Sequence, residues 1–222
     1  MTEAVRALAL DVVSDVVCPW CYLGKKRLEK ALALAAPLAV TVRWRPYQLD
    51  PTIPPEGKSR AAYLAEKFRD PARVEVMHRD LAALGAAEGI AFRFEAIAVS
   101  PNTLDAHRLS RWALGAGVQE AVVDALFRAY FVEGRDVGDR SVLAGIAGAC
   151  GMDSAEIADL LASDADCARV EEEIALARRI GVTGVPTFIV GERYALVGAQ
   201  APEALAEALA AIAARQDADS AL

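Results

Sequence analysis

Histidine is almost absent from this 222-residue chain, which contains only two. Two histidines exclude a histidine-rich metal site, and we expect no metal. Basic residues are also in the minority, since 24 lysines and arginines stand against 31 aspartates and glutamates, a formal net charge of -7. Nucleic-acid binding draws on clusters of positive charge. The composition therefore predicts no nucleic-acid partner.

Long apolar runs are absent as well. None approaches the roughly 20 residues that a membrane-spanning helix needs, so no membrane association is expected. No secretory leader is recognisable, because Glu3 lies near the start and Arg6 and Asp11 interrupt the apolar run that follows. We therefore expect a cytoplasmic protein, and in the cytoplasm thiols are mostly kept reduced. That compartment favours catalytic or redox-responsive cysteines over a structural disulfide.

The chain is rich in apolar residues: 55% are hydrophobic and 25% are charged. This balance supports a packed core and argues against a disordered chain. The length suits one large domain, or one domain that carries a substantial insertion.

Two of the four cysteines form the motif Cys18-Pro19-Trp20-Cys21. The apolar run before it, residues 8–13, predicts a buried strand. After it, Leu28 and Leu32 recur on one face of a predicted helix. The opposite face of that helix carries charged residues: Lys25, Lys26, Glu29 and Lys30. The motif therefore lies where a strand ends and a helix begins.

This position has a chemical consequence for the two thiols. The free N–H groups and the positive dipole end of a helix N-terminus favour a negative charge, and the thiolate is the form that attacks disulfides. We interpret Cys18 as the nucleophile and Cys21, one turn later, as the thiol that resolves a mixed disulfide. Pro19 suits the first helical turn. The alternatives are half of a zinc site or two inert core thiols.

Asp15 and Trp20, close to the two cysteines, could each have a functional or a purely structural role. Asp15 could tune the ionisation of the thiols or relay a proton, or it could serve only in a turn or cap. Trp20 could contact the substrate, or it could simply cover the site, and we favour both roles together.

The second pair of cysteines, Cys150 and Cys167, lies far from the motif. Cys150 extends the apolar stripe of Leu143 and Ile146, and Cys167 begins another stripe, so both are interpreted as small core residues. The sharper alternative is an auxiliary disulfide that exchanges electrons with the motif. A four-cysteine zinc site is disfavoured, because this pair lacks the required short spacing.

The rest of the chain has a simple order. Residues 40–47 alternate with period two and predict a second strand. Residues 61–180 are mostly helical in pattern, with an extended break at 90–98 and a helix through Trp112. Residues 187–190 and 195–197 predict a hairpin. A closing helix is expected over 202–214, with a frayed tail after Arg215.

Two stretches carry a resemblance to a known family. Residues 14–24, Ser-Asp-Val-Val-Cys-Pro-Trp-Cys-Tyr-Leu-Gly, and residues 181–188, Gly-Val-Thr-Gly-Val-Pro-Thr-Phe, resemble the two signatures of the DsbA-like thioredoxin-fold family. The FrnE-type branch matches best, and it is related to 2-hydroxychromene-2-carboxylate isomerases and kappa-class glutathione transferases. The resemblance implies an α/β, thioredoxin-like fold with a large helical insertion. It divides the chain into a discontinuous thioredoxin-like domain, 1–60 and 181–222, and an inserted helical domain, 61–180.

The resemblance also suggests residues that bind substrate. The matching proline of the family is cis and lies against the cysteines, so Pro186 would turn the backbone of Val185 toward an extended substrate. The plainer alternative is a proline at a strand entry. Residues 102–108, Asn-Thr-Leu-Asp-Ala-His-Arg, resemble a stretch of the isomerase and transferase relatives. On that basis Asn102 and His107 are candidates for the pocket, although a packed or capping histidine is the favoured interpretation.

Together these features predict a thiol–disulfide oxidoreductase that acts on protein or small-molecule disulfides and thiols. No cofactor is required, and glutathione is a candidate co-substrate. The alternative is a glutathione-dependent isomerase or transferase, although such relatives typically carry serine where this chain has Cys18. A binding or chaperone module without turnover is the third hypothesis. The protein is expected to be a monomer or a homodimer.

Overall fold

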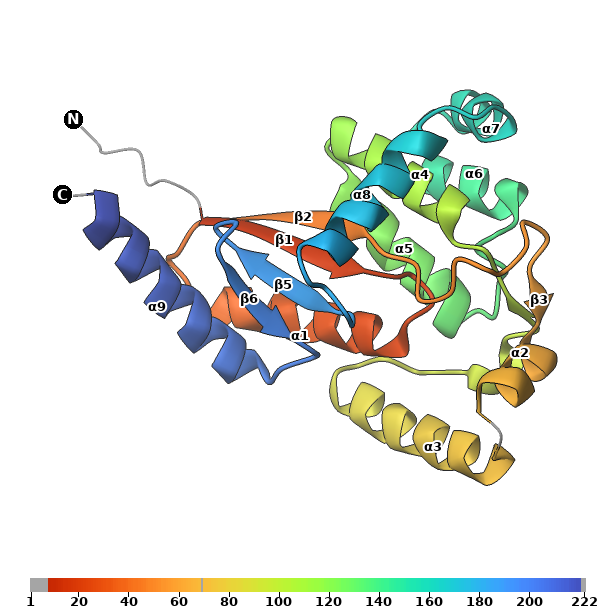
Figure 1. The fold of residues 1–222 in the computed structure, drawn as a ribbon, viewed down its shortest axis with the longest axis horizontal. Helices are drawn as coiled ribbons and strands as arrows, with labels where there is room; N and C mark the ends of the chain where they lie inside the picture. The colour runs from red at the N-terminus through yellow and green to blue at the C-terminus, as the bar shows by residue number, and fades with distance from the viewer. Residues whose placement is uncertain (1–7, 69, 221–222) are drawn as a thin grey trace.

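The computed structural model describes residues 8–68 and 70–220. At its centre lies a four-stranded sheet of β1 (Leu8–Ser14), β2 (Val40–Pro46), β5 (Thr187–Val190) and β6 (Tyr194–Val197). The strand order is β2-β1-β5-β6, with β1 and β2 parallel and the other pairs antiparallel. Helix α1 (Pro19–Leu34) joins β1 to β2 (Figure 1). The predicted β-α-β unit and the C-terminal hairpin are therefore confirmed.

The two faces of the sheet bury different side chains, because residues alternate along a strand. On one face Leu8, Leu10 and Val12 join the main hydrophobic core with α1 and α9 (Pro202–Ser220), two helices that pack against each other. On the other face Val13 belongs to a small separate cluster that includes Ala177 of α8 (Cys167–Arg179). Helices thus cover both sides of the strand that leads into Cys18.

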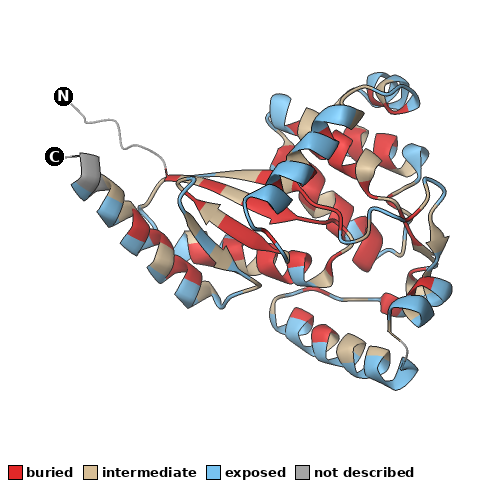
Figure 2. Ribbon diagram, in the orientation of Figure 1, coloured by how far each residue is buried: buried red, intermediate tan, exposed pale blue. Residues whose placement is uncertain are grey.

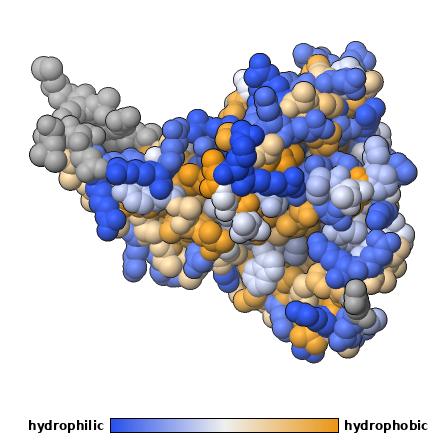
Figure 3. All heavy atoms as spheres, in the orientation of Figure 1, coloured by the Kyte–Doolittle hydropathy of each residue, from blue (hydrophilic) through white to orange (hydrophobic). Residues whose placement is uncertain are grey.

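The chain between β2 and β5 forms a largely helical part, and none of its elements joins the four-stranded sheet. In order these elements are β3 (Lys58–Ser59), α2 (Arg60–Lys67), α3 (Pro71–Ala87), a 3-10 turn (Phe94–Ala96), β4 (Val99–Ser100), α4 (Leu104–Gly115), α5 (Gln119–Phe131), α6 (Arg140–Ala149), α7 (Ser154–Ala162) and α8. Buried residues are concentrated along the sheet, α1, α4 and α5, whereas the outer sides of α3, α7 and α9 are largely exposed (Figure 2). Hydrophobic residues also reach the surface in the middle of the face shown in Figure 3.

The main core crosses from the sheet into this helical part without interruption. Leu10 of β1, Leu23 of α1 and Phe127 of α5 belong to the same buried cluster. The division at residues 60 and 180 therefore stays a prediction about folding units. Residues 1–7, which contributed to the expectation of no leader, lie outside the described residues. None of the helices in the described ranges is long and apolar enough to cross a membrane.

Three local predictions differ from the structure. Residues 90–98 contain no strand and are irregular apart from the 3-10 turn; the strand β4, which pairs with β3, begins only at Val99. The closing helix α9 continues to Ser220 instead of ending near Ala214. Lys25 is not on a solvent face: its side chain is 2% exposed and contacts the carboxylates of Glu29, Glu120 and Asp124.

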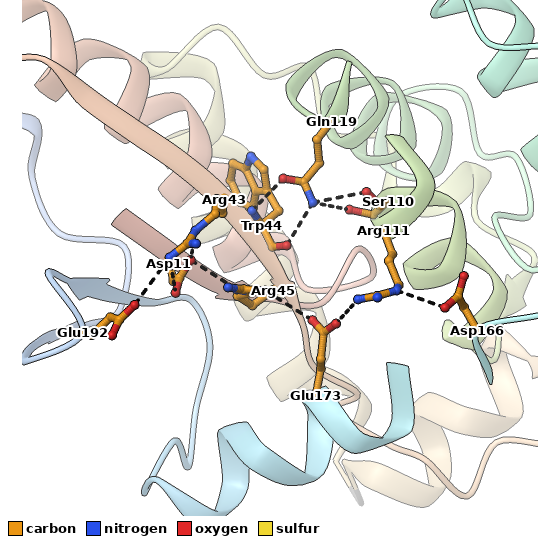
Figure 4. Close-up of polar contacts among 10 residues, drawn as sticks. All are labelled: Asp11, Arg43, Trp44, Arg45, Ser110, Arg111, Gln119, Asp166, Glu173 and Glu192. Carbon is orange, nitrogen blue, oxygen red and sulfur yellow. Dashed lines mark hydrogen bonds and ion pairs between the residues drawn. The ribbon is translucent and has the colours of Figure 1, made fainter. Parts of the chain in front are cut away.

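Polar side chains connect the helical part to the outer strand β2 (Figure 4). The side chain of Gln119 accepts a hydrogen bond from the Trp44 N–H (2.9 Å) and donates one to the Trp44 carbonyl (3.0 Å). A chain of ion pairs runs beside it, from Arg43 to Asp11, Arg45, Glu173, Arg111 and Asp166 in that order. The edge of β2 is thus satisfied by a side chain instead of another strand.

Candidate active site

Cys18 is the N-cap residue of α1, with extended backbone angles (φ −91°, ψ 114°). Its amide donates to the Asp15 carbonyl (3.0 Å), and its own carbonyl accepts from the Cys21 amide (3.0 Å). Pro19 occupies the first helical position, where a missing N–H costs nothing. The turn after β1 therefore places the first thiol at the helix N-terminus, as the motif predicts.

The two thiols of the motif have different surroundings. Cys18 lines a cavity, whereas Cys21 has 0% exposure and lies behind it. Burial raises the pKa of the Cys21 thiol well above its ordinary value, and the hydrogen bond and charge of Cys18 raise it further. The Ser14 hydroxyl and the backbone of Asp15 lower it only in part. Cys21 is therefore a protonated thiol at neutral pH, and Cys18 is the one that a ligand meets.

The Val185–Pro186 loop lies opposite Cys18. The Cys18 thiol donates to the Val185 carbonyl over 3.7 Å, and the Val185–Pro186 peptide bond is cis. Pro186 is buried against α1, where a Cβ added to Gly24 would lie 2.8 Å from its ring carbon Cγ. Only glycine permits this approach. The role of Gly24 was missed in the sequence, although the residue ends the first signature stretch.

The cavity beside Cys18 has a volume of about 310 Å³. Near the thiol its wall includes Pro19, Trp20 and Val185, and Trp20 is 42% exposed at its entrance. The far end is built by α2 and α3. The far-end residues had no signal in the sequence, because they reach the cavity only through tertiary packing: Arg60, Tyr63, Lys67 and His78.

Asp15 is almost completely buried in the cavity wall. Its carboxylate accepts from the Leu49 amide (2.8 Å), and the other oxygen lies 3.6 Å from Nε2 of His107. Its influence on the pKa of Cys21 comes through its backbone. The carboxylate of Asp15 thus fixes the loop at Leu49, and only its main chain contacts the resolving thiol. A role of the carboxylate in tuning the thiols or relaying a proton stays a prediction.

His107 and Asn102 stand behind the cavity and do not line it. The Nε2 atom of buried His107 donates to the Tyr47 carbonyl (2.8 Å). Asn102 accepts from the Leu104 amide (2.9 Å) and donates to the Ile53 carbonyl (2.7 Å). Both side chains hold the loop after β2, so the structure gives them a supporting position and no direct contact with the cavity.

Cys150 and Cys167 are free thiols at helix ends and are only partly buried, because Cys150 follows α6 and Cys167 begins α8. Burial raises the pKa of both. The charged neighbour of Cys150 is Asp124, whereas Cys167 is near Arg108. Cys150 packs against the main hydrophobic core, as the interpretation as a small core residue predicts, whereas Cys167 belongs to neither core cluster, so that interpretation is wrong for Cys167. Within the described ranges, no group of three or more His, Cys, Asp or Glu side chains could hold a metal ion.

A four-stranded sheet with two thiols at the start of its first helix and a cis-proline loop opposite them defines a thioredoxin-like protein. The chain belongs to the DSBA-like thioredoxin domain family, whose model matches residues 9–210. The predicted α/β fold and the family are both confirmed.

The solved structures that are similar to this chain include the following three. A probable DsbA oxidoreductase from Streptomyces coelicolor is 34% identical, with a TM-score of 0.85 over 91% of this chain and 88% of the other. A 2-hydroxychromene-2-carboxylate isomerase shares 23% identity, with a TM-score of 0.71 over 95% and 98%. The cytosolic disulfide reductase DsbM from Pseudomonas aeruginosa, solved with GSH, shares 20% identity, with a TM-score of 0.57 over 97% and 100%. The last two show the fold alone.

Proposed function

We propose that this protein is a thiol–disulfide oxidoreductase of the DsbA and FrnE type, with Cys18 as the attacking thiol and Cys21 as the resolving thiol. The observation that carries the proposal is the contrast between the two sulfurs. Cys18 lines the cavity beside Val185, and Cys21 is fully enclosed behind it with a raised pKa. An arrangement of this kind directs a substrate to one sulfur and keeps the second for an intramolecular step.

The reaction proceeds by two exchanges. The Cys18 thiolate attacks one sulfur of a substrate disulfide, the S–S bond breaks, and the first substrate thiolate leaves. Cys21 then loses its proton and attacks the Cys18 sulfur of the mixed disulfide, which releases the second substrate thiolate. The substrate gains two electrons and the protein forms the Cys18–Cys21 disulfide. The reverse sequence would form a disulfide in the substrate.

The residues around Cys18 have supporting roles in this proposal. Val185 would align an extended substrate through its main chain, and Pro19 and Trp20 would pack on it. Asp15 would hold the wall, together with His107 and Asn102 behind it. The chemistry needs no metal or nucleotide. Glutathione is proposed as reductant, with protein or small-molecule disulfides as substrates, in the cytoplasm, for a monomer or homodimer.

The test is a titration of the protein against a glutathione redox buffer, followed by alkylation and mass mapping of all four cysteines. We expect Cys18 and Cys21 to become oxidised together in a two-electron transition, while Cys150 and Cys167 stay reduced. Reduction of insulin disulfides should be abolished by Cys18→Ser and retained in a Cys150→Ser, Cys167→Ser double variant. Insulin reduction that persists in a Cys18→Ser, Cys21→Ser double variant would refute the proposal and favour a binding module.

The glutathione-dependent isomerase is the second candidate, because the cavity is large enough for a small ring compound and the fold is shared with an isomerase. Incubation with glutathione and a hydroxychromene carboxylate separates the two functions. Turnover that survives Cys18→Ser would favour the isomerase. We expect none, since the proposed chemistry depends on the sulfur.

A further inference from the structure

Two side chains in the part of the cavity wall that α2 and α3 build each have a buried nitrogen atom without a hydrogen-bond partner. These atoms are Nε of Arg60, at the start of α2, and Nε2 of His78, in α3. The guanidinium of Arg60 makes one long contact, from Nη1 to the Ser100 hydroxyl (3.4 Å). Among the described residues no carboxylate lies within ion-pair distance of Arg60. These two nitrogen atoms have almost no accessible surface, so the cavity presents the rest of the Arg60 guanidinium to a ligand. A guanidinium that lines a cavity without a carboxylate partner is suited to bind an anionic group.

The acidic residues of the cavity are engaged elsewhere. Asp15 accepts from the Leu49 amide, and Asp50 accepts from the amide (3.0 Å) and hydroxyl (2.6 Å) of Thr52. Lys67, at the exposed rim, donates to the Tyr63 hydroxyl (2.8 Å). The cavity wall therefore contains two positive charges, and Arg60 has no ion-pair partner among the described residues. The hydrogen bond from Thr52 lowers the pKa of Asp50 in the same wall, and the charge of Lys67 helps to lower it.

The rest of the cavity wall is mainly apolar. It includes Ile53, Leu64, Phe68 and Met77, with the ring of Tyr63. His78 is stacked on Phe94, with ring centroids 4.2 Å apart, which fixes the orientation of the imidazole. The pKa of His78 is lowered by burial and by Arg60, so the imidazole is neutral at neutral pH and can still donate one hydrogen bond.

We infer that the substrate of Cys18 is a small, largely apolar or aromatic disulfide that carries a carboxylate, which Arg60 binds while a substrate sulfur contacts the thiol. This inference rests on the proposed function and names its substrate class. The Arg60 guanidinium pairs with the carboxylate, His78 lies beside it in the cavity wall, and the apolar wall holds the body of the molecule. The Cys18 thiolate then displaces one substrate thiolate, and Cys21 displaces the other.

Two aromatic disulfides test the inference in single-turnover reactions of the reduced protein. Dithiobis(nitrobenzoate) carries a carboxylate on each ring, and dithiodipyridine carries none. The second-order rate constant of each is measured for the wild type and for Arg60→Gln. The matched control is Lys58→Gln, which also removes one positive charge and lies two residues from Arg60. The Lys58 side chain pairs with Glu66 (3.0 Å) and does not line the cavity.

We expect Arg60→Gln to slow the carboxylated probe about tenfold, the effect of losing one charge-assisted hydrogen bond, and to change the neutral probe less than about twofold. Arg60→Lys should recover part of the rate. Equal slowing of both probes by Arg60→Gln, or equal effects of Arg60→Gln and Lys58→Gln on the carboxylated probe, would overturn the inference.

The proposed function fails by a different result. If neither probe reacts at Cys18, or if the mixed disulfide at Cys18 is never resolved by Cys21, the dithiol chemistry itself is absent. A normal reaction with the neutral probe in every Arg60 variant shows that the variants are folded and that the dithiol works. The comparison of the two probes then reports on carboxylate recognition alone.

Discussion

Gly24 has no side chain, and this allows the Val185–Pro186 loop to lie close to helix α1, which begins after Cys18. It lies in the second turn of α1, where glycine normally weakens a helix by about 1 kcal/mol relative to alanine. Its hydrogen atom faces the ring of Pro186, and the cis-proline loop closes on the helix at that point. The distance between Cys18 and Val185 therefore depends on a residue that contacts neither.

Substitution of Gly24 by alanine should reverse the usual helix preference. The new Cβ would lie 2.8 Å from Cγ of Pro186, and a proline ring cannot rotate away. We expect the free energy of unfolding to fall by about 1–3 kcal/mol, as for other overpacked sites, and the rate of reaction at Cys18 to fall with it. Urea unfolding and the neutral disulfide probe measure the two effects.

Gly145 provides the matched control for this substitution. It lies inside α6, and an added Cβ would have only one neighbour, the Arg135 guanidinium at 4.0 Å. Gly145→Ala should therefore stabilise the protein by up to about 1 kcal/mol. A Gly24→Ala variant as stable as Gly145→Ala would contradict the close contact with Pro186.

At the scale of elements, β2 is an outer strand whose polar groups are satisfied by α5. Gln119 is the first residue of α5, and its amide pairs with both backbone groups of Trp44 as a neighbouring strand would. The carboxylate of Glu120 in the same turn accepts from the Trp44 indole (2.7 Å). These bonds fix α5 on β2. The loop that contains Leu49 follows this strand.

Replacement of Gln119 by methionine keeps the shape of the side chain and removes its polar groups. The N–H and C=O of Trp44, a residue that is 6% exposed, would then be left unpaired. We expect the free energy of unfolding to fall by about 2–4 kcal/mol, because each buried unpaired group costs about 1–3 kcal/mol. Chemical denaturation measures this loss.

The control for this prediction is Gln200→Met. Gln200 is exposed, and its side chain donates to the Val197 carbonyl, which water can also reach, so a change within about 0.5 kcal/mol is expected. A similar fall in the free energy of unfolding in both variants would show that the hydrogen bonds from Gln119 to Trp44 do not account for the effect.

Across the whole molecule, charged residues link helices that are distant in sequence. Lys25 and Lys26 of α1 pair with Asp124 of α5, and Lys30 of α1 pairs with Glu88 after α3. Burial alone would raise the pKa of Asp124, but Lys26 and Lys25 outweigh it, so the pKa is lowered. The same balance, with Lys30 and Arg27, lowers the pKa of Glu88.

These shifts predict a loss of stability in acid. A carboxylate with a depressed pKa in the folded state binds fewer protons than in the unfolded chain, so its contribution is fully present above the unfolded pKa of about 4. The contribution is lost as the pH falls from about 4 through the lower folded values. We expect the free energy of unfolding, measured by urea titration from pH 7 to pH 2, to fall below about pH 4.

The double variant Asp124→Asn, Glu88→Gln isolates this effect. It should be less stable than the wild type at pH 7 and should show a shallower decline below about pH 4, because two of the groups that take up protons are gone. Identical declines for the two proteins would show that these ion pairs do not contribute to the acid sensitivity.

The sequence by itself determined the features that depend on neighbouring residues. Residues 8–14 form a strand, Pro19 begins a helix, and Cys18 lies at its N-terminus because backbone conformation follows local periodicity and the fixed φ of proline. The hairpin at 187–197 was likewise predicted from its local sequence pattern. The identity of the two thiols and of the proline loop followed from two short signatures.

Only the tertiary structure decided which side chains meet across the chain. Lys25 was expected in solvent and is buried, because α5 brings two carboxylates to it from about 100 residues away. Asn102 and His107 face the loop after β2 instead of the cavity, and Arg60 and His78 line the cavity without any local signal. A helical repeat shows which face is apolar, but contacts over such separations are set by how the helices pack on the sheet.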